Sequence, residues 1–177
     1  MSVGKVATQV AFSLGMGLCG FVGVTALLNS GLLGSDENVL TIGGENEVMV
    51  AAQQEAATTL PRFLELAATT PAGWGPISLK VGMQGRDMVE HIWIEDIEAS
   101  GSGSFAGKLA NDPVALTGLN LGSRVFFDRE QVTDWAVIID GRGYGYYTIR
   151  ASKDFVTEEE AAQFSAFLAD QPLPPEF

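Results

Sequence analysis

The sequence predicts an α+β domain that follows an N-terminal membrane segment. Residues 6–28 are almost wholly apolar or small, and no charged side chain lies between Lys5 and Asp36. The remaining chain begins with apolar residues at helical spacing, continues as short strand-like runs separated by tight turns, and ends in a capped helix. Short strands joined by tight turns are typical of an antiparallel sheet. We therefore expect a transmembrane helix or signal sequence, then a small domain with an antiparallel sheet and flanking helices.

The N-terminal segment is long enough to cross a lipid bilayer. A helix rises about 1.5 Å per residue, so residues 6–28 match a hydrocarbon core of roughly 30 Å. Residues 24–26 form a passable signal cleavage site, but the apolar run continues through Leu28, which favours an uncleaved anchor. Lys5 is the only side-chain cation on the short flank, and positive flanks stay in the cytoplasm. The predicted location is therefore the cell membrane, single-pass, with the C-terminal domain outside the cytoplasm. A secreted or periplasmic protein after signal cleavage is the alternative.

Composition limits the number of domains and the chemistry. Residues 29–46 are rich in Gly, Ser and Asn and predict a flexible linker, which leaves residues 47–177 as one domain of ordinary size. The chain carries 22 acidic and 10 basic side chains, a net charge of −12, which argues against nucleic-acid binding. One cysteine and one histidine cannot build the usual zinc sites, so we expect no metal and no cofactor. The predicted partner is the membrane, through residues 6–28, and any protein partner stays unknown.

Two helices are predicted before the sheet. Residues 48–57 hold several alanines and other good helix formers. Pro61 interrupts this pattern, so a second helix is expected to begin near Thr59, whose side chain can cap it. Apolar residues at helical spacing give the second helix one buried face: Leu60, Phe63, Leu64 and Ala67.

Six strands and a last helix follow. The strands are predicted at residues 77–83, 89–97, 104–110, 124–127, 133–139 and 144–150. Residues 140–143 predict a hairpin turn, because Asp and Gly suit positive φ. Thr157 and Glu160 match a capping box at the start of the last helix, and prolines from Pro172 onward leave an extended tail.

The chain resembles one bacterial family through motifs that occur in a fixed order. These motifs are Glu90-His91-Ile92-Trp93, Gln131 with Asp134-Trp135, Asp140-Gly141, and Tyr147-Thr148-Ile149-Arg150. The resemblance is to the YegJ-like family, catalogued as domain of unknown function 2314, and it covers about residues 48–150. Members often carry an N-terminal signal or anchor. The resemblance implies a compact α+β domain and implies no catalytic residues, because the family brings no established activity.

His91 and Trp93 are the first candidates for a binding site. They are two residues apart in a predicted strand and therefore share a face, whereas Glu90 points to the opposite face. A histidine beside an aromatic ring can line a polar pocket or act as an acid–base group. The favoured interpretation is structural: a partly buried His91 whose ring nitrogens bond to backbone groups.

Asp134, Trp135 and Arg150 are the other candidates. Asp134 is expected to hold a turn or to form an internal ion pair with Arg150, and Trp135 is expected to fill the core. The binding alternative makes Trp135 a platform for a sugar or peptide, since aromatic rings offer large, rigid contact area. Arg150 can grip a ligand carboxylate with two nitrogens. These structural roles are favoured, and no residue is assigned a catalytic role.

Three functions are consistent with these observations. The leading hypothesis is a membrane-anchored, non-enzymatic binding or accessory domain that faces the periplasm or exterior. The first alternative is a hydrolase that uses His91 with Glu95 or Asp134. The second alternative is an acidic interaction protein that neutralises a basic partner.

Overall fold

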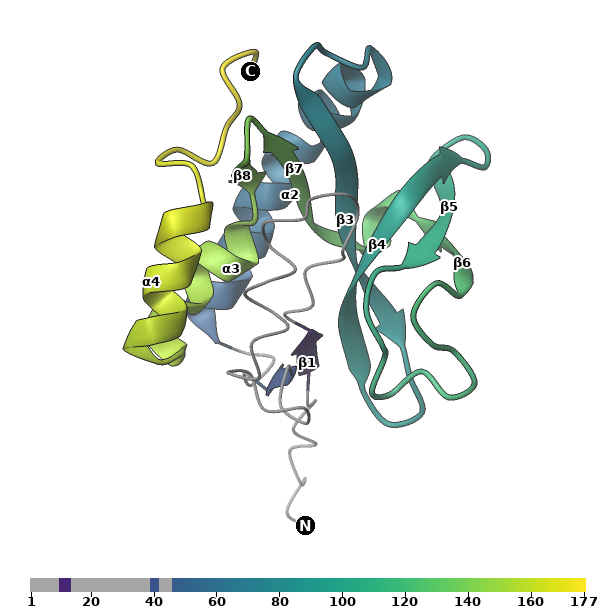
Figure 1. Cartoon of the computed structure of the whole chain (residues 1–177). Helices are drawn as coiled ribbons and strands as arrows, with labels where there is room; N and C mark the ends of the chain where they lie inside the picture. The colour runs from purple at the N-terminus through teal and green to yellow at the C-terminus, as the bar shows by residue number, and fades with distance from the viewer. Residues whose placement is uncertain (1–9, 14–38, 42–45) are drawn as a thin grey trace.

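Six strands form the sheet of this domain, and every pairing among them is antiparallel. The computed structural model describes residues 10–13, 39–41 and 46–177. Across the sheet the strands follow the order β8-β7-β3-β4-β5-β6 (Figure 1). Their bounds are β3 Trp74–Gln84, β4 Val89–Ala99, β5 Ser104–Leu109, β6 Arg124–Asp128, β7 Val132–Ile139 and β8 Arg142–Gly145. Five of the six predicted strands therefore occur close to their predicted bounds.

The predicted anchor at residues 6–28 and linker at residues 29–46 fall largely outside the described residues. Two short strands in this part are described: β1 Val10–Ser13 pairs in parallel with β4, and β2 Val39–Thr41 pairs with β1. Among the helices of the described ranges, none has the length and apolar character needed to cross a bilayer. The anchor, the linker and the membrane topology remain predictions.

The first described helix, α2 Glu47–Ala68, is continuous, so the predicted break at Pro61 is wrong. Asn46 begins it, because its side-chain oxygen accepts the backbone N–H of Val48 at 3.0 Å. Pro61 is exposed, while the buried face of the helix continues past it from Met49 to Phe63. Burial of that face against β7 offsets the one helical hydrogen bond that a proline removes.

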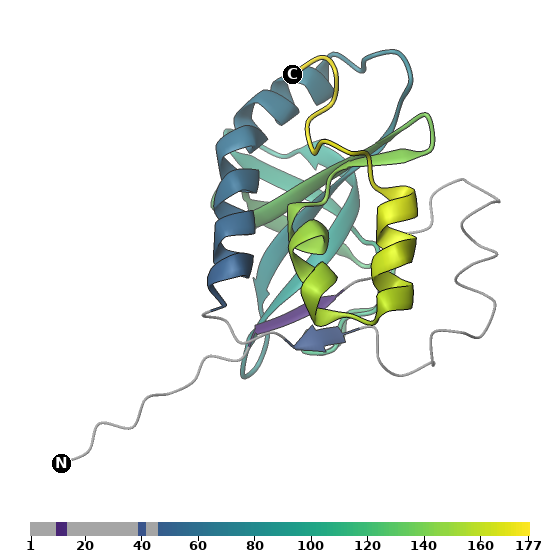
Figure 2. The ribbon, with the colours of Figure 1, turned by 90° about the vertical axis from the view of Figure 1, so that its left-hand side faces the viewer.

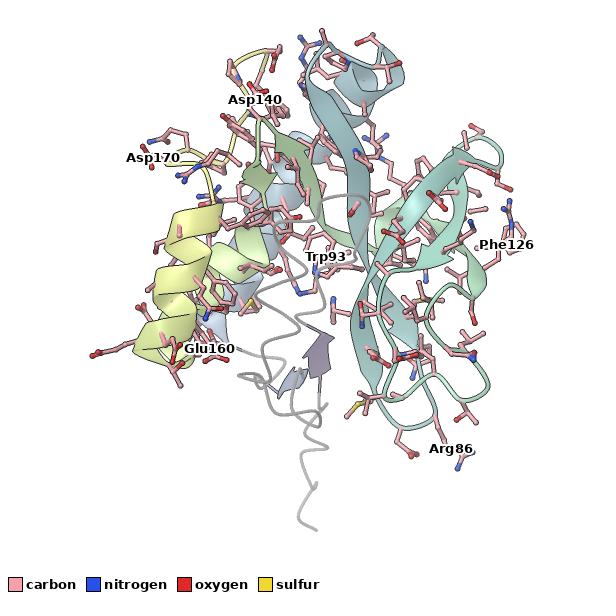
Figure 3. The ribbon with its side chains drawn as sticks, viewed as in Figure 1. Arg86, Trp93, Phe126, Asp140, Glu160 and Asp170 are labelled. Carbon is pink, nitrogen blue, oxygen red and sulfur yellow. The ribbon has the colours of Figure 1, made fainter. Side chains whose placement is uncertain are left out.

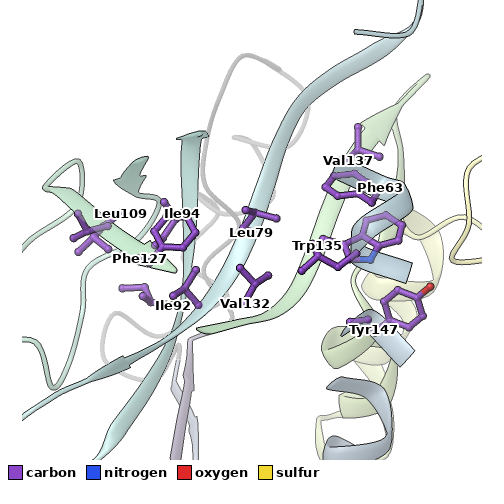
Figure 4. Packing of buried hydrophobic residues seen from close by; sticks show 14 of the residues in the cluster. Phe63, Leu79, Ile92, Ile94, Leu109, Phe127, Val132, Trp135, Val137 and Tyr147 are labelled. Carbon is purple, nitrogen blue, oxygen red and sulfur yellow. The ribbon is translucent and has the colours of Figure 1, made fainter. Parts of the chain in front are cut away.

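The main core lies between α2 and one face of the sheet (Figure 4). Trp135 on β7 stacks on Phe63 of α2, with ring centroids 4.2 Å apart. Strands β3, β4 and β7 supply other large side chains of this layer: Leu79, Val81, Ile92, Ile94 and Val132. Trp135 is fully buried, so the prediction that it fills the core is confirmed.

The chain leaves the sheet earlier than predicted. β8 ends at Gly145 and the helix α3 Tyr147–Ala151 follows, so the predicted strand over residues 144–150 is wrong after its first residues. Tyr146 has a φ of 52°, a left-handed conformation that ends the extended backbone. The Asp134 carboxylate accepts the next two backbone N–H groups, from Tyr147 at 3.1 Å and Thr148 at 2.8 Å. These bonds satisfy two backbone N–H groups in the first turn of the helix, and the same two groups are then not available to pair with a neighbouring strand.

The last helix and the β7–β8 hairpin follow the sequence prediction. α4 Glu158–Phe167 begins with the predicted capping box, in which the Thr157 N–H donates to the Glu160 carboxylate at 2.8 Å. Asp140 and Gly141 have positive φ in the hairpin turn. Figure 2 shows α3 between α2 and α4, with the sheet behind them. The α+β architecture with an antiparallel sheet and flanking helices is confirmed for this part of the chain.

Candidate functional site

A buried polar cluster lies on the sheet face opposite the main core. Lys80 on β3 pairs with Trp93 on β4 on one side and with Asp134 on β7 on the other. Lys80 and Asp134 are each 1% exposed, and Trp93 is 2% exposed. Trp93 also contacts the ring of Tyr146, with centroids 5.3 Å apart, in a small apolar cluster beneath α3 and α4 (Figure 3). The structure thus places two of the predicted site residues, Trp93 and Asp134, on either side of Lys80.

Asp134 is held by four hydrogen-bond donors. One carboxylate oxygen accepts the backbone N–H groups of Trp135 at 2.8 Å and Tyr147 at 3.1 Å. The other accepts the backbone N–H of Thr148 at 2.8 Å and its hydroxyl at 2.7 Å. Burial raises the pKa of Asp134, while the bonds from Thr148 and the charge of Lys80 oppose that rise. The expectation that Asp134 holds a turn is confirmed.

Lys80 is connected to Asp134 through Thr148. The Lys80 ammonium donates to the Thr148 hydroxyl at 3.2 Å, and that hydroxyl donates onward to Asp134. The ammonium also lies 5.5 Å from the centroid of the Trp93 ring, within the range of a cation–π contact. Burial lowers the pKa of Lys80 from 10.5 to about 8, and the charge of Asp134 opposes this effect.

His91 lies on the same face of the sheet, two residues before Trp93 on β4. Its Nδ1 lies 2.9 Å from the hydroxyl of Thr133, which donates to the backbone carbonyl of Lys80 at 3.3 Å. Burial, with a smaller effect of the Lys80 charge, lowers the pKa of His91 from 6.5 to about 4, so the ring is neutral at pH 7. The predicted burial of His91 is confirmed. The predicted backbone partner is wrong for Nδ1, because the partner of this nitrogen is the Thr133 hydroxyl.

Arg150 does not form the predicted ion pair with Asp134. Its guanidinium donates to three backbone carbonyls: Gly145 at 2.8 Å, Ala169 at 2.8 Å and Gly143 at 3.2 Å. The prediction failed because Arg150 lies on α3 and not on a return strand, and Asp134 is already surrounded by its four donors. Arg150 therefore fastens α3 to β8 and to the segment after α4.

Trp135 lies on the other face of β7, away from the polar cluster. Its indole N–H donates to the Thr59 hydroxyl at 2.9 Å, and Phe177 stacks on it with centroids 5.6 Å apart. The Thr59 hydroxyl lies 3.3 Å from the hydroxyl of Tyr147. These contacts connect Trp135, α2 and the C-terminal tail, and they leave no exposed ring surface for a ligand.

A groove lies between α2, α3 and the C-terminal tail; we call it the α2–α3 groove. One part has a volume of about 500 Å³ and an adjoining part about 450 Å³, and the two share Ala51, Glu55, Tyr147 and Pro172. The rest of the lining is mostly small or apolar: Val48, Ala52, Ala151 and Leu173. Glu47, Arg150 and the polar side chains of Gln54, Thr58 and Thr59 complete it. Of the predicted site residues, Arg150 alone lines this groove.

Lys80 and Thr148 were not among the predicted site residues, although Thr148 lies in one of the family motifs. Lys80 carried no usable signal, because it stands between Leu79 and Val81 in a strand whose apolar residues alternate with polar or small ones, and such a pattern predicts a solvated lysine. Glu47 and Glu55 carried no signal either, since acidic residues on a helix are usually solvated. No group of His, Cys, Asp and Glu residues suited to a metal ion occurs within residues 10–13, 39–41 and 46–177.

The fold and these sites define a small α+β domain with a lysine and an aspartate buried on one sheet face and an acidic groove beside its helices. The chain belongs to the family described as "Uncharacterized protein conserved in bacteria (DUF2314)", which matches residues 46–169. The predicted resemblance is thereby confirmed.

Two relatives extend this result. The chain is 27% identical to "Uncharacterized protein YegJ" of Escherichia coli strain K12 over 132 residues, which cover 75% of this chain and 84% of the relative. It is 35% identical over 80 residues to "Putative ankyrin repeat protein NMB1133/NMB1171" of Neisseria meningitidis serogroup B, across 45% of this chain and 31% of that protein. The chain therefore corresponds to under a third of the Neisseria protein. No solved structure matches the chain.

Proposed function

We propose that this chain is a membrane-anchored, non-enzymatic binding protein whose domain faces the periplasm or exterior. We further propose that its α2–α3 groove receives a cationic, partly apolar peptide segment of a partner protein. The observation that carries the proposal is the groove itself, a concave surface of about 500 Å³ whose lining is mostly apolar with a few polar groups. Binding sites for small ligands and short segments commonly have this size and composition.

The charge of the groove supports a cationic ligand. Glu47 and Glu55 contribute two carboxylates to the lining. Arg150 is the one cation among the lining residues, and three backbone carbonyls already accept its N–H groups. The whole chain has a net charge of −12, so its field attracts basic partners over a longer range. A segment with Lys or Arg beside small apolar side chains fits this environment.

The binding test uses the full chain in detergent micelles and a fluorescent amphipathic peptide of Lys and Ala. Binding to protein-free micelles is subtracted. We expect the double variant Glu47→Gln/Glu55→Gln to bind the peptide roughly tenfold more weakly than the parent, because two carboxylates of the groove lining lose their charge. Binding to the parent should also weaken as salt rises.

The matched control is Glu65→Gln/Glu130→Gln, which removes the same charge from two exposed carboxylates outside the groove lining. It should bind like the parent. Equal affinity of both double variants would mean that the groove does not hold the peptide, and the proposal would then be wrong.

The membrane part of the proposal has its own test. A reporter enzyme that works only outside the cytoplasm, fused after Phe177, should be active because Lys5 marks the cytoplasmic flank. Activity of a strictly cytoplasmic reporter at the same point would contradict this topology. The hydrolase alternative requires His91 to reach a substrate, whereas the residue is only 8% exposed and its Nδ1 lies within hydrogen-bond distance of the Thr133 hydroxyl.

A further inference from the structure

The outer strand β6 carries an exposed aromatic residue between two opposite charges. Phe126 is 67% exposed, the largest exposed fraction among the described large apolar side chains. Arg124 and Asp128 are exposed on the same face of the strand, while Val125 and Phe127 point into the core. Figure 3 shows Phe126 at the edge of the domain farthest from the helices. Among the described strands, β6 pairs only with β5.

The free edge of β6 presents backbone groups at these same three residues. Arg129 N–H donates to Gly103 at 2.9 Å and Leu109 N–H donates to Ser123 at 3.0 Å, which fixes the odd-numbered residues as the hydrogen-bonded pairs with β5. Hydrogen-bonded and non-bonded pairs alternate in an antiparallel ladder. The N–H and C=O groups of residues 124, 126 and 128 therefore point away from β5. Consistent with this, the Asp128 N–H donates to the side chain of Gln131 and not to β5.

We propose that β6 pairs with β6 of a second copy of this chain, antiparallel, with Phe126 on the two-fold axis. In that register Arg124 lies opposite Asp128 of the second copy, and Asp128 lies opposite the second Arg124, so two cross-strand ion pairs form. The two Phe126 rings meet at the centre, and their backbone groups exchange two hydrogen bonds. The sequence of the exposed face, Arg-Phe-Asp, is self-complementary only in this antiparallel arrangement.

The strand is short, so the association is weak and concentration-dependent. One backbone group of this edge is already bonded, because the Asp128 N–H donates to the Gln131 side chain at 2.9 Å; that bond is exposed and has to exchange if the Asp128 N–H pairs with the second copy. The Arg124 guanidinium donates to the Glu98 carboxylate at 2.7 Å, and the Asp128 carboxylate accepts the Ser104 hydroxyl at 2.7 Å. Glu98, Arg124 and Asp128 are all exposed to solvent. Exposed ion pairs contribute little and exchange readily. This surface lies on β6, whereas the α2–α3 groove lies beside the helices, so the two proposals are independent.

The test is a charge reversal measured by sedimentation equilibrium of the full chain in detergent over a range of protein concentrations. Arg124→Asp places two aspartates opposite each other in the pair, and Asp128→Arg places two arginines opposite each other. Each variant should dimerise roughly tenfold more weakly than the parent. An equimolar mixture of the two variants should recover the parent's affinity, because every cross-strand pair again joins opposite charges.

Recovery on mixing separates this interface from damage to the fold or pairing elsewhere in the chain. Arg62→Asp and Asp154→Arg change the net charge identically at exposed positions away from β6, and they should dimerise like the parent. Phe126→Pro removes the central outward N–H without touching the β5 ladder and should abolish the dimer. A parent that stays monomeric at all concentrations, or variants that stay unaffected or do not recover on mixing, would overturn the proposal.

Discussion

Thr148 and Asp134 are joined by two hydrogen bonds to the same carboxylate oxygen, one from the backbone N–H at 2.8 Å and one from the hydroxyl at 2.7 Å. Since Asp134 belongs to β7 and Thr148 to the first turn of α3, this contact determines where the chain changes from strand to helix. The Thr148 hydroxyl also accepts the Lys80 ammonium at 3.2 Å. The Thr148 hydroxyl therefore bonds to both Lys80 and Asp134, two buried groups of opposite charge.

Removal of the Thr148 hydroxyl should destabilise the domain. Thr148→Val keeps the shape of the side chain but leaves a buried ammonium and a buried carboxylate each one partner short. The expected loss in the free energy of unfolding is roughly 2–3 kcal/mol. Thr148→Ser restores the hydroxyl and should lose under ~1 kcal/mol. Urea unfolding of the two variants measures the difference, and equal losses would show that the hydroxyl has no part in stability.

Because Lys80 is buried, the free energy of unfolding should vary with pH in the alkaline range. Its folded-state pKa of about 8 lies below the ordinary 10.5, so the unfolded chain binds more protons than the folded chain between these values. Stability should therefore rise as pH increases from about 8 toward 10.5, by on the order of 3 kcal/mol at most. Lys80→Met removes the titrating group and should flatten this rise in urea unfolding. A rise that persists in the variant would assign the effect to another group.

The sequence was sufficient for most of the fold because its signals there are local. Positive φ at Asp140 and Gly141 follows from residue type, and the Thr157–Glu160 capping box lies within four residues. The continuous helix through Pro61 was missed because packing against a distant strand decides it. The change from β8 to α3 was missed for the same reason, since the carboxylate that causes it is Asp134 on another strand.

The polar cluster depends on strand register, which the sequence does not show locally. Lys80 meets Trp93 and Asp134 only because β4 and β7 pair with β3 in the observed alignment. The register shifts between Lys80 and Val81 in the pairing with β7, and at this irregularity Thr133 comes within hydrogen-bonding distance of His91. Residue types alone could suggest candidate site residues, but the contacts that these residues make are determined by the register of the strands.

His91 should act as a structural residue whose contribution depends on acidic pH. Its folded-state pKa of about 4 lies below 6.5, so the unfolded chain takes up a proton first as pH falls. The parent should lose stability between pH 6.5 and 4, by on the order of 3 kcal/mol at most. His91→Gln should be modestly less stable at pH 7, because the bond to Thr133 is altered, yet should lose less on acidification.

Binding separates the structural role of His91 from a catalytic one. The variant should bind the Lys and Ala peptide like the parent at a temperature where both are folded. If His91→Gln unfolds like the parent at every pH but loses an activity or interaction, the structural interpretation is wrong.

Gly145 should tolerate no side chain, in contrast to Gly141 in the neighbouring hairpin turn. Both have positive φ, 74° and 77°, so alanine costs backbone strain at either position. A methyl group on Gly145 would also overlap the backbone oxygen and indole ring of Trp135, whereas one on Gly141 would meet no atom within 4 Å. We expect Gly141→Ala to lower the free energy of unfolding by roughly 1 kcal/mol and Gly145→Ala by roughly 3 kcal/mol or more. Urea unfolding of the two variants under the same conditions measures the contrast. Equal losses would mean that strain alone accounts for Gly145, and that the close approach of β8 to Trp135 does not require glycine.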